Sequence, residues 1–324
     1  MSGERGLALI KKWNDYWFRP APLINLAITR IVVVLFQLVY LLVIGFRMNV
    51  LAHARLPDTL FAPLPILRAL TFPFGGGFRP GAALLDTIFW ITLAAGVLAV
   101  IGLKTRPSLF VFAFGNAFLQ AFLFSFGDFH HPQALMILAL FILALGPSGE
   151  VLSLDDFFRR QSVESLEGGP GLPAWERFGI FASWPLLLVQ WLYALIYMSA
   201  AINKLVKGGP GWLNGYTLQY YLLQDGLRWG SSLGVAMSQI HLLALGMSLV
   251  TVLFEGTFFL VLFFPRLWLI YIPLGFLLHT GIYLTMRAPF PQWIVIYAVF
   301  VPWRSIIRRL ALRFRGESWA KQSL

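Results

Sequence analysis

Eight apolar stretches, each long enough or nearly long enough to cross a bilayer, dominate this sequence. They lie near residues 24–46, 83–103, 108–126, 132–147, 179–201, 236–264, 267–286 and 291–303. A membrane-spanning helix needs about 20 apolar residues, and the fourth and eighth stretches are shorter. Because the hydrocarbon core offers backbone groups no water, helices are the expected spanning structure for such stretches. We therefore predict an all-α, polytopic integral membrane bundle of about eight transmembrane helices.

The composition supports a bilayer rather than water as the surrounding solvent. The chain is 58% hydrophobic and only 12% charged, whereas an average soluble domain is about 25% charged. Its net charge of +11 is expected to set topology and to attract membrane lipids, not nucleic acid. The absence of cysteine excludes disulfides and thiolate metal sites, and we predict no metal.

The pattern predicts one transmembrane domain over residues 1–310 and a basic cytoplasmic tail over 311–324. Residues 1–20 are typical of an amphipathic interfacial helix ahead of the first span. The segment 57–81 is rich in proline and glycine, which indicates an interfacial or re-entrant path.

Lysine and arginine placement predicts the orientation of the chain. The termini and even-numbered connections hold about twice as many of these residues as the odd-numbered ones, and such residues favour the cytoplasmic side. Both termini are therefore expected in the cytoplasm. The connections near 47–82, 127–131, 202–235 and 287–290 are then expected to face outward.

Ionisable side chains within apolar stretches are costly and need a reason to be there. Each could be a structural ion pair, a helix–helix hydrogen bond or an interfacial anchor, or it could carry function. The candidates are Arg30, Asp86, His130, His131, Lys204, His241, Glu255 and His279.

Lys204 is the strongest of these candidates. It ends a hydrophobic stretch and follows the small residues Ser199, Ala200 and Ala201, which allow helices to approach closely. Desolvation there would favour the neutral amine and let it act as a base. A snorkelling lysine is the structural alternative.

Two histidine-containing features come next. His130 and His131 are adjacent, so their side chains diverge on a helix, and we expect one of them to face a pocket. Glu255 and His279 both lie near the middle of neighbouring antiparallel stretches by the helical rise of about 1.5 Å per residue. A contact between this carboxyl and this imidazole could serve as structural glue or as a proton relay.

Several segments together resemble a known family. They are WNDYWFRP, HPQALMILALFILALGPSGEVLSLD, YALIYMSAAINKLVKGGPGWLNGYTLQYYL, then Glu255, and HTGIYLTMRAPFPQW. In this order they are similar to the transmembrane domain of vitamin K-dependent γ-glutamyl carboxylases and their bacterial relatives, the HTTM proteins. The third segment carries the most specific likeness, through Tyr197, Ala200, Lys204, Leu205, Trp212, Gly215 and Tyr216.

The resemblance implies an activity of the lyase type. Lys204 would be the base that deprotonates vitamin K hydroquinone or a related quinol at the outer face, assisted by His131 or His130. The residues expected to contact the substrate are Trp212, Tyr216, Tyr197, His279, Glu255 and Arg287. A peptide or protein substrate and a place in a bacterial inner membrane are also implied.

Two other functions stay open. The sequence departs from the family pattern at Ala201 and Asn203, which leaves room for a non-catalytic accessory, maturation or immunity partner of another protein. A transporter would explain intramembrane Arg30, Glu255 and His279, but the sequence has no convincing internal repeat of the kind transporters show. The residues alone do not decide whether the protein is an enzyme.

Overall fold

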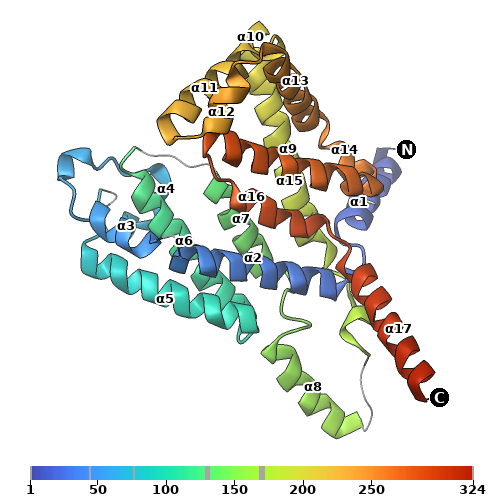
Figure 1. Ribbon diagram of the computed structural model, residues 1–324. Helices are drawn as coiled ribbons and strands as arrows, with labels where there is room; N and C mark the ends of the chain where they lie inside the picture. The colour runs from blue at the N-terminus through green and yellow to red at the C-terminus, as the bar shows by residue number, and fades with distance from the viewer. Residues whose placement is uncertain (1, 44, 76, 128–131, 168–171, 323–324) are drawn as a thin grey trace. The chain divides into compact units, whose positions relative to one another are not determined.

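The computed structural model describes residues 2–43, 45–75, 77–127, 132–167 and 172–322 (Figure 1). Within these ranges the chain is predominantly helical, with almost no sheet. Two short strands, β1 (Ala21–Pro22) and β2 (Phe178–Gly179), pair antiparallel with Ala21 opposite Gly179. The chain forms two compact units, which are Met1–Val189 with Val301–Leu324 (unit 1) and Gln190–Phe300 (unit 2).

The helices of unit 1 are α1 (Ser2–Trp17), α2 (Leu23–Val43), α3 (Phe46–His53), η1 (Asp58–Leu60), α4 (Pro65–Leu70), η2 (Phe72–Phe74), α5 (Ala82–Ile101), α6 (Thr105–Phe124), α7 (Pro132–Leu145), α8 (Leu154–Glu167), η3 (Ala174–Glu176) and α17 (Trp303–Gln322). The helix α9 (Ser183–Val206) begins in unit 1 and continues in unit 2. Unit 2 also holds α10 (Pro210–Leu213), α11 (Tyr216–Trp229), α12 (Ser232–Ser238), α13 (His241–Thr257), α14 (Leu260–Phe263), η4 (Pro265–Leu267), α15 (Trp268–Met286), α16 (Pro291–Ile296) and η5 (Tyr297–Phe300).

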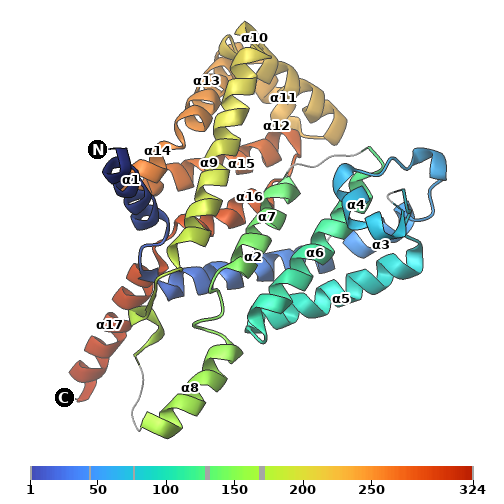
Figure 2. The ribbon, with the colours of Figure 1, turned by 180° about the vertical axis from the view of Figure 1, so that it is seen from behind.

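In unit 1, α2, α5, α6 and α7 pack against one another, as Figure 2 shows from behind. Small residues let these helices approach closely. A Cβ added to Gly96 of α5 would lie 2.6 Å from the Phe112 ring of α6. Between α2 and α6, the buried Gln37 amide donates to Asn116 Oδ1 at 2.8 Å, which satisfies polar groups that lipid could not.

In unit 2, α11 and α12 form a hairpin that packs on α13 and α15. The axes of α12 and α13 differ by 102°. Gln219 of α11 stabilises this bend, because its amide donates to Ser238 O at 2.7 Å and its carbonyl oxygen lies 2.9 Å from His241 Nδ1. The Gln219 side chain thus forms hydrogen bonds with a backbone carbonyl and an imidazole at the point where helix α12 ends.

Among the described residues, five helices are long and apolar enough to cross a membrane, and they are Leu23–Val43, Ala82–Ile101, Thr105–Phe124, Ser183–Val206 and Pro265–Met286. The bent pair α12–α13 adds a sixth if it counts as one span. These helices confirm the prediction of an all-α integral membrane protein. The count of about eight is not confirmed, because Gln133–Leu145 and Pro291–Phe300 are apolar but short.

The predicted sixth stretch, 236–264, differs most from the expectation. It is not one helix, because α12 ends at Ser238, α13 ends at Thr257 and α14 begins only at Leu260. Hydropathy alone does not register such breaks. The segment 57–81, for which an interfacial or re-entrant path is predicted, holds only the short helices η1, α4 and η2 among its described residues.

Candidate functional site

One face of α9 carries the tyrosine and lysine side chains around which the candidate site of unit 2 is built. Tyr193, Tyr197, Ala201 and Lys204 follow one another at spacings of four, four and three residues, which places them on the same side of a helix. The first three are buried, with 0%, 3% and 3% of their surface exposed. Small Ala201 between Tyr197 and Lys204 leaves room for the neighbouring helix α13.

Lys204 forms an ion pair with Glu255 of α13. The ammonium donates to both carboxylate oxygens, at 2.8 Å to Oε1 and 2.6 Å to Oε2. The two side chains are only 19% and 9% exposed. The indole of Trp212 lies over the ammonium, 5.2 Å from Nζ to the ring centroid, a cation–π distance. Two opposite charges therefore share a largely water-free space, where removing either one leaves the other uncompensated.

The loop after α9 is shaped to bring Trp212 over Lys204. A Cβ on Gly208 would lie 2.1 Å from the Trp212 ring, so only glycine permits this approach. Gly215 has a φ of +81°, a conformation that favours glycine. Ser248 of α13 donates to the Trp212 carbonyl. Gly208 and Gly215 therefore allow the loop conformation that places Trp212 next to Lys204.

Next to the ion pair lies a buried cluster of three phenols and an imidazole. Tyr197 Oη lies 2.8 Å from His279 Nε2 and 2.7 Å from Tyr297 Oη. Tyr193 Oη donates to Trp293 O at 3.1 Å and lies 3.4 Å from Tyr197 Oη. Such a continuous hydrogen-bonded chain can hold or pass a proton among its members.

His279 has one ring nitrogen without a partner. Its Nδ1 is buried and makes no hydrogen bond within the described chain, although Nε2 is bonded to Tyr197. The rings of Phe290 and Trp293 lie 5.5 and 5.8 Å from the imidazole. A buried polar atom left unpaired is costly and calls for an explanation. A ligand that bonds to Nδ1 would provide one.

The structure brings five of the predicted site residues into the two neighbouring groups of unit 2. Lys204, Glu255 and Trp212 form one group, and Tyr197 and His279 belong to the other. The expected contact between Glu255 and His279 is replaced by separate partners, because the α9 side chains Lys204 and Tyr197 reach these two residues instead.

Two further predicted substrate contacts lie elsewhere. Tyr216 is 61% exposed and stacks on His241 with 4.4 Å between ring centroids. Arg287 is exposed, with its guanidinium 5.8 Å from the Tyr283 ring. Neither contacts the Lys204 pair. The predicted catalytic pair His130 and His131 lies outside the described residues.

Sequence reasoning missed Tyr193, Tyr297 and Trp293. The spacing of four between Tyr193 and Tyr197 was a readable signal on α9. Tyr297 could not be found in this way, because a hundred residues separate it from Tyr197. Gly275 of α15 makes room for its hydroxyl, since a Cβ there would overlap Tyr297 Oη at 1.8 Å.

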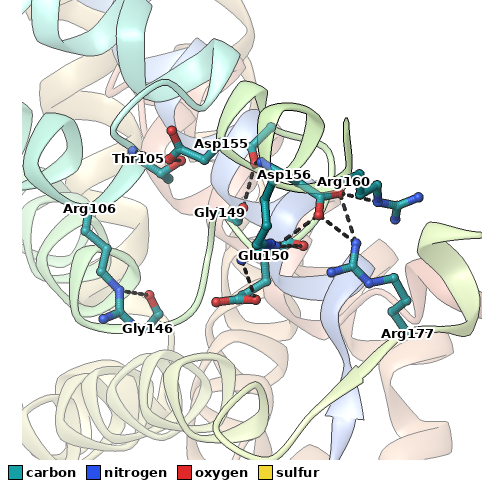
Figure 3. A network of polar contacts seen from close by, with 11 residues as sticks. Thr105, Arg106, Gly146, Gly149, Glu150, Asp155, Asp156, Arg160 and Arg177 are labelled. Atoms are coloured by element: carbon teal, nitrogen blue, oxygen red, sulfur yellow. Dashed lines mark hydrogen bonds and ion pairs between the residues drawn. The ribbon is translucent and has the colours of Figure 1, made fainter. Parts of the chain in front are cut away.

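A second polar cluster lies in unit 1 (Figure 3). The Asp156 carboxylate accepts from three guanidinium groups, at 3.0 Å from Arg159, 3.1 Å from Arg160 and 2.7 Å from Arg177. Burial alone would raise the pKa of Asp156, but the hydrogen bonds of Arg177 and Arg159 hold it below its usual value. This cluster joins α8 to the segment that leads into β2.

Asp155 caps the start of α6. Its carboxylate accepts from Lys104 N, Thr105 N and Thr105 Oγ1, each at 2.7 Å. Burial would raise the pKa of Asp155, yet these hydrogen bonds and the charge of Arg30 hold it below its usual value. The carboxylate thus satisfies backbone donors that a helix start leaves unpaired.

The remaining intramembrane candidates have structural partners. Arg30, fully buried, donates to Ser148 O at 3.0 Å and Leu152 O at 2.6 Å. Asp86 accepts two hydrogen bonds from Arg47, at 2.6 and 3.1 Å. Both residues therefore connect elements of unit 1.

Comparison with known proteins assigns this chain to no family. No group of three or more His, Cys, Asp or Glu residues able to hold a metal occurs among the described residues. No protein-family model, curated protein or solved structure matches this chain.

Proposed function

We propose that this protein is a membrane-embedded enzyme of the carboxylase-like, quinol-dependent type, in which Lys204 and Glu255 accept a proton from a lipophilic substrate. The ion pair between them, only 19% and 9% exposed and covered by Trp212, carries the proposal. The eight-span topology with both termini in the cytoplasm of a bacterium belongs to the same proposal.

The pair can accept a proton without a third charged group. In a water-poor site the proton of Lys204 can move along its 2.6 Å hydrogen bond to Glu255, which converts both groups to neutral forms. The freed amine then takes a proton from an acidic hydroxyl, and Glu255 keeps the first. A quinol supplies such a hydroxyl. The base expected from the sequence is thus a pair, with Glu255 storing the proton.

The second group of unit 2 fits the other end of such a substrate. His279 Nδ1 is buried without a partner, and the Tyr197 hydroxyl fixes the imidazole through Nε2. The surrounding rings Phe290 and Trp293 are suited to a flat aromatic ligand. His279 would bind and orient the ring by a hydrogen bond, while Lys204 and Glu255 move the proton.

The proposal is tested by measuring oxygen consumption of the purified protein supplied with a naphthoquinol, the reduced form of a naphthoquinone. We expect Lys204→Met to lower the rate by 10²–10⁴-fold, the usual contribution of a positioned acid or base. Lys207→Met is the matched control, because Lys207 is exposed three residues further along and should leave the rate unchanged. Full activity of folded Lys204→Met would refute the assignment.

Lys204→Met leaves the Glu255 carboxylate without its charged partner and can therefore impair folding. A second variant is needed to separate folding from activity. The double variant Lys204→Met/Glu255→Leu removes both charges and should fold like the wild type while remaining inactive. If the wild type itself neither consumes oxygen nor retains a quinone through purification, the enzyme reading fails.

A different function is supported by α11. Its residues Tyr216, Tyr220, Leu223 and Leu227 form one helical stripe and are 61%, 60%, 37% and 67% exposed. Such a stripe suits an accessory role in which another membrane or exported protein binds α11. Loss of a co-purifying protein in Tyr220→Ser/Leu227→Ser, with oxygen consumption absent throughout, would favour this alternative.

A further inference from the structure

A cleft of about 410 Å³ opens in unit 1, between the start of α6 and the connection from α7 to α8. Three basic side chains, Lys104, Arg106 and Arg159, line it together with the acidic Glu150 and Asp155. Its volume falls within the range of small-molecule binding sites. We name it the Lys104 cleft.

The walls of the Lys104 cleft are locked together. Asp155 bonds the Lys104 and Thr105 amides on the opposite wall, as Figure 3 shows for Thr105. A Cβ on Gly149 would lie 2.5 Å from Thr105 Oγ1, so the two walls touch. Arg30 donates to the Ser148 carbonyl at 3.0 Å, in the connection from α7 to α8. The cleft is therefore formed before any ligand arrives.

The charges of the cleft do not cancel. Asp155 is used by the three donors at the start of α6, and Glu150 pairs with Arg159 at 3.1 Å. Within the described part of the chain, Lys104 and Arg106 have no carboxylate partner, and the Arg106 guanidinium donates only from Nε to Gly146 O at 3.3 Å. Three cations against two carboxylates leave the lining with a net positive charge, and the exposed Lys104 and Arg106 are the cations available to an anion that enters the cleft.

Apolar side chains continue from the cleft along α6 and α7. Val111 and Phe114 on α6 are 43% and 50% exposed, and Leu138 and Leu145 on α7 are 45% and 57% exposed. The rings of Phe114 and Phe141 meet at 4.8 Å, which shows that the two helices adjoin there. An anion site at the end of two exposed apolar stripes fits an amphiphile better than a free ion.

We infer that the Lys104 cleft binds the phosphate headgroup of an anionic phospholipid, whose acyl chains lie along α6 and α7. The cleft adjoins the start of a candidate membrane span, where headgroup phosphates lie, and basic clefts of this kind on the cytoplasmic side recognise anionic lipids. Lys104 and Arg106 would contact the phosphate. Val111, Phe114, Leu138 and Leu145 would contact the chains.

Native mass spectrometry of the full chain in detergent tests this inference. The protein is titrated with phosphatidylglycerol or with phosphatidylcholine of the same acyl chains. We expect one tight phosphatidylglycerol per chain and no matching phosphatidylcholine. Lys104→Gln and Arg106→Gln should each weaken binding about fivefold, the usual effect of one basic residue at an anionic surface. Arg309→Gln, an exposed arginine on α17, is the control.

Three results would overturn the inference. They are equal affinity for the two lipids, an Arg309→Gln effect as large as that of Arg106→Gln, and displacement of the lipid by millimolar inorganic phosphate. The last would mean that the cleft takes a free anion. A further variant, Val111→Ser/Phe114→Ser, removes apolar surface without touching charge and should also weaken retention.

Discussion

The ion pair of unit 2 and the Asp156 cluster of unit 1 use the same kinds of charge in opposite ways. Asp156 meets three arginines that are 46%, 31% and 22% exposed, so each cation can return to water when its contact is lost. In the part of the chain that the structure describes, Lys204 and Glu255 have only each other as charged partners, at 19% and 9% exposure. The Asp156 side chain is itself only 7% exposed, but three partly exposed cations share it, so the cluster stabilises structure with redundancy. An exclusive buried pair has no such redundancy and is costly to keep, and the cost points to use.

Breaking the buried pair should have the largest effect. We expect Glu255→Leu to destabilise the protein by about 3–5 kcal/mol, because it leaves the Lys204 ammonium without its partner. The double variant Lys204→Met/Glu255→Leu should recover most of that loss. Thermal unfolding in detergent measures both variants. An additive double variant, worse than either single one, would mean that the two charges are not coupled.

Removing the carboxylate at the centre of the Asp156 cluster should cost less, because its three arginines are partly exposed and can return to water. We expect Asp156→Asn to destabilise by about 1–3 kcal/mol, the range for losing hydrogen bonds to a charged group. Arg160→Gln should cost under about 1 kcal/mol, since Asp156 keeps its contacts with Arg159 and Arg177 and the partly exposed Arg160 contributes little by itself. Thermal unfolding of the same preparations gives the comparison. If Asp156→Asn equals Glu255→Leu in cost, the contrast between the two regions disappears.

Acid should lower the stability of the protein by protonating the Asp155 and Asp156 carboxylates of unit 1. The pKa values of Asp155 and Asp156 are lowered by folding, so their contribution is present above about pH 3.9, the ordinary value for aspartate. It is lost as pH falls further, through the lower folded values. Melting temperature should therefore drop steeply below pH 4, and Asp155→Asn/Asp156→Asn should flatten the drop. Asp225→Asn on α11 is the control and should follow the wild-type curve.

The sequence predicted the spans well where one helix fills one apolar stretch. Leu23–Val43 and Thr105–Phe124 lie close to the predicted 24–46 and 108–126. The prediction differed at 236–264, because hydropathy averages over the break that Gln219 stabilises between α12 and α13. The hydrogen bonds at that break come from a side chain some twenty residues away, which a local hydropathy pattern does not report.

The candidate site was predictable in its parts and not in its pairing. Lys204, Glu255 and His279 stand out as ionisable groups in apolar surroundings, which is a local signal. Which of them meet depends on helix rotation and on the bend before α13, and these are tertiary properties. Lys204 therefore reached Glu255, and His279 met Tyr197 instead of the expected carboxylate.

The smallest change in stability is expected at His279, and it separates structure from use most sharply. His279→Phe removes the hydrogen bond to Tyr197, but it also removes the unpaired buried Nδ1. Tyr197 keeps its 2.7 Å contact with Tyr297. These opposing terms should leave stability within about 1 kcal/mol of the wild type.

If Nδ1 holds a ligand, the same variant should lose a bound quinone through purification, which mass spectrometry of extracted lipids measures. Tyr271→Phe, whose hydroxyl donates to Thr257 Oγ1 at 2.8 Å, is the matched control for losing one intramembrane hydrogen bond. A large loss of stability in His279→Phe with unchanged quinone content would make the imidazole a structural connector, like Arg30 in unit 1. Unchanged stability with lost quinone would show that the unpaired nitrogen serves ligand binding and not packing.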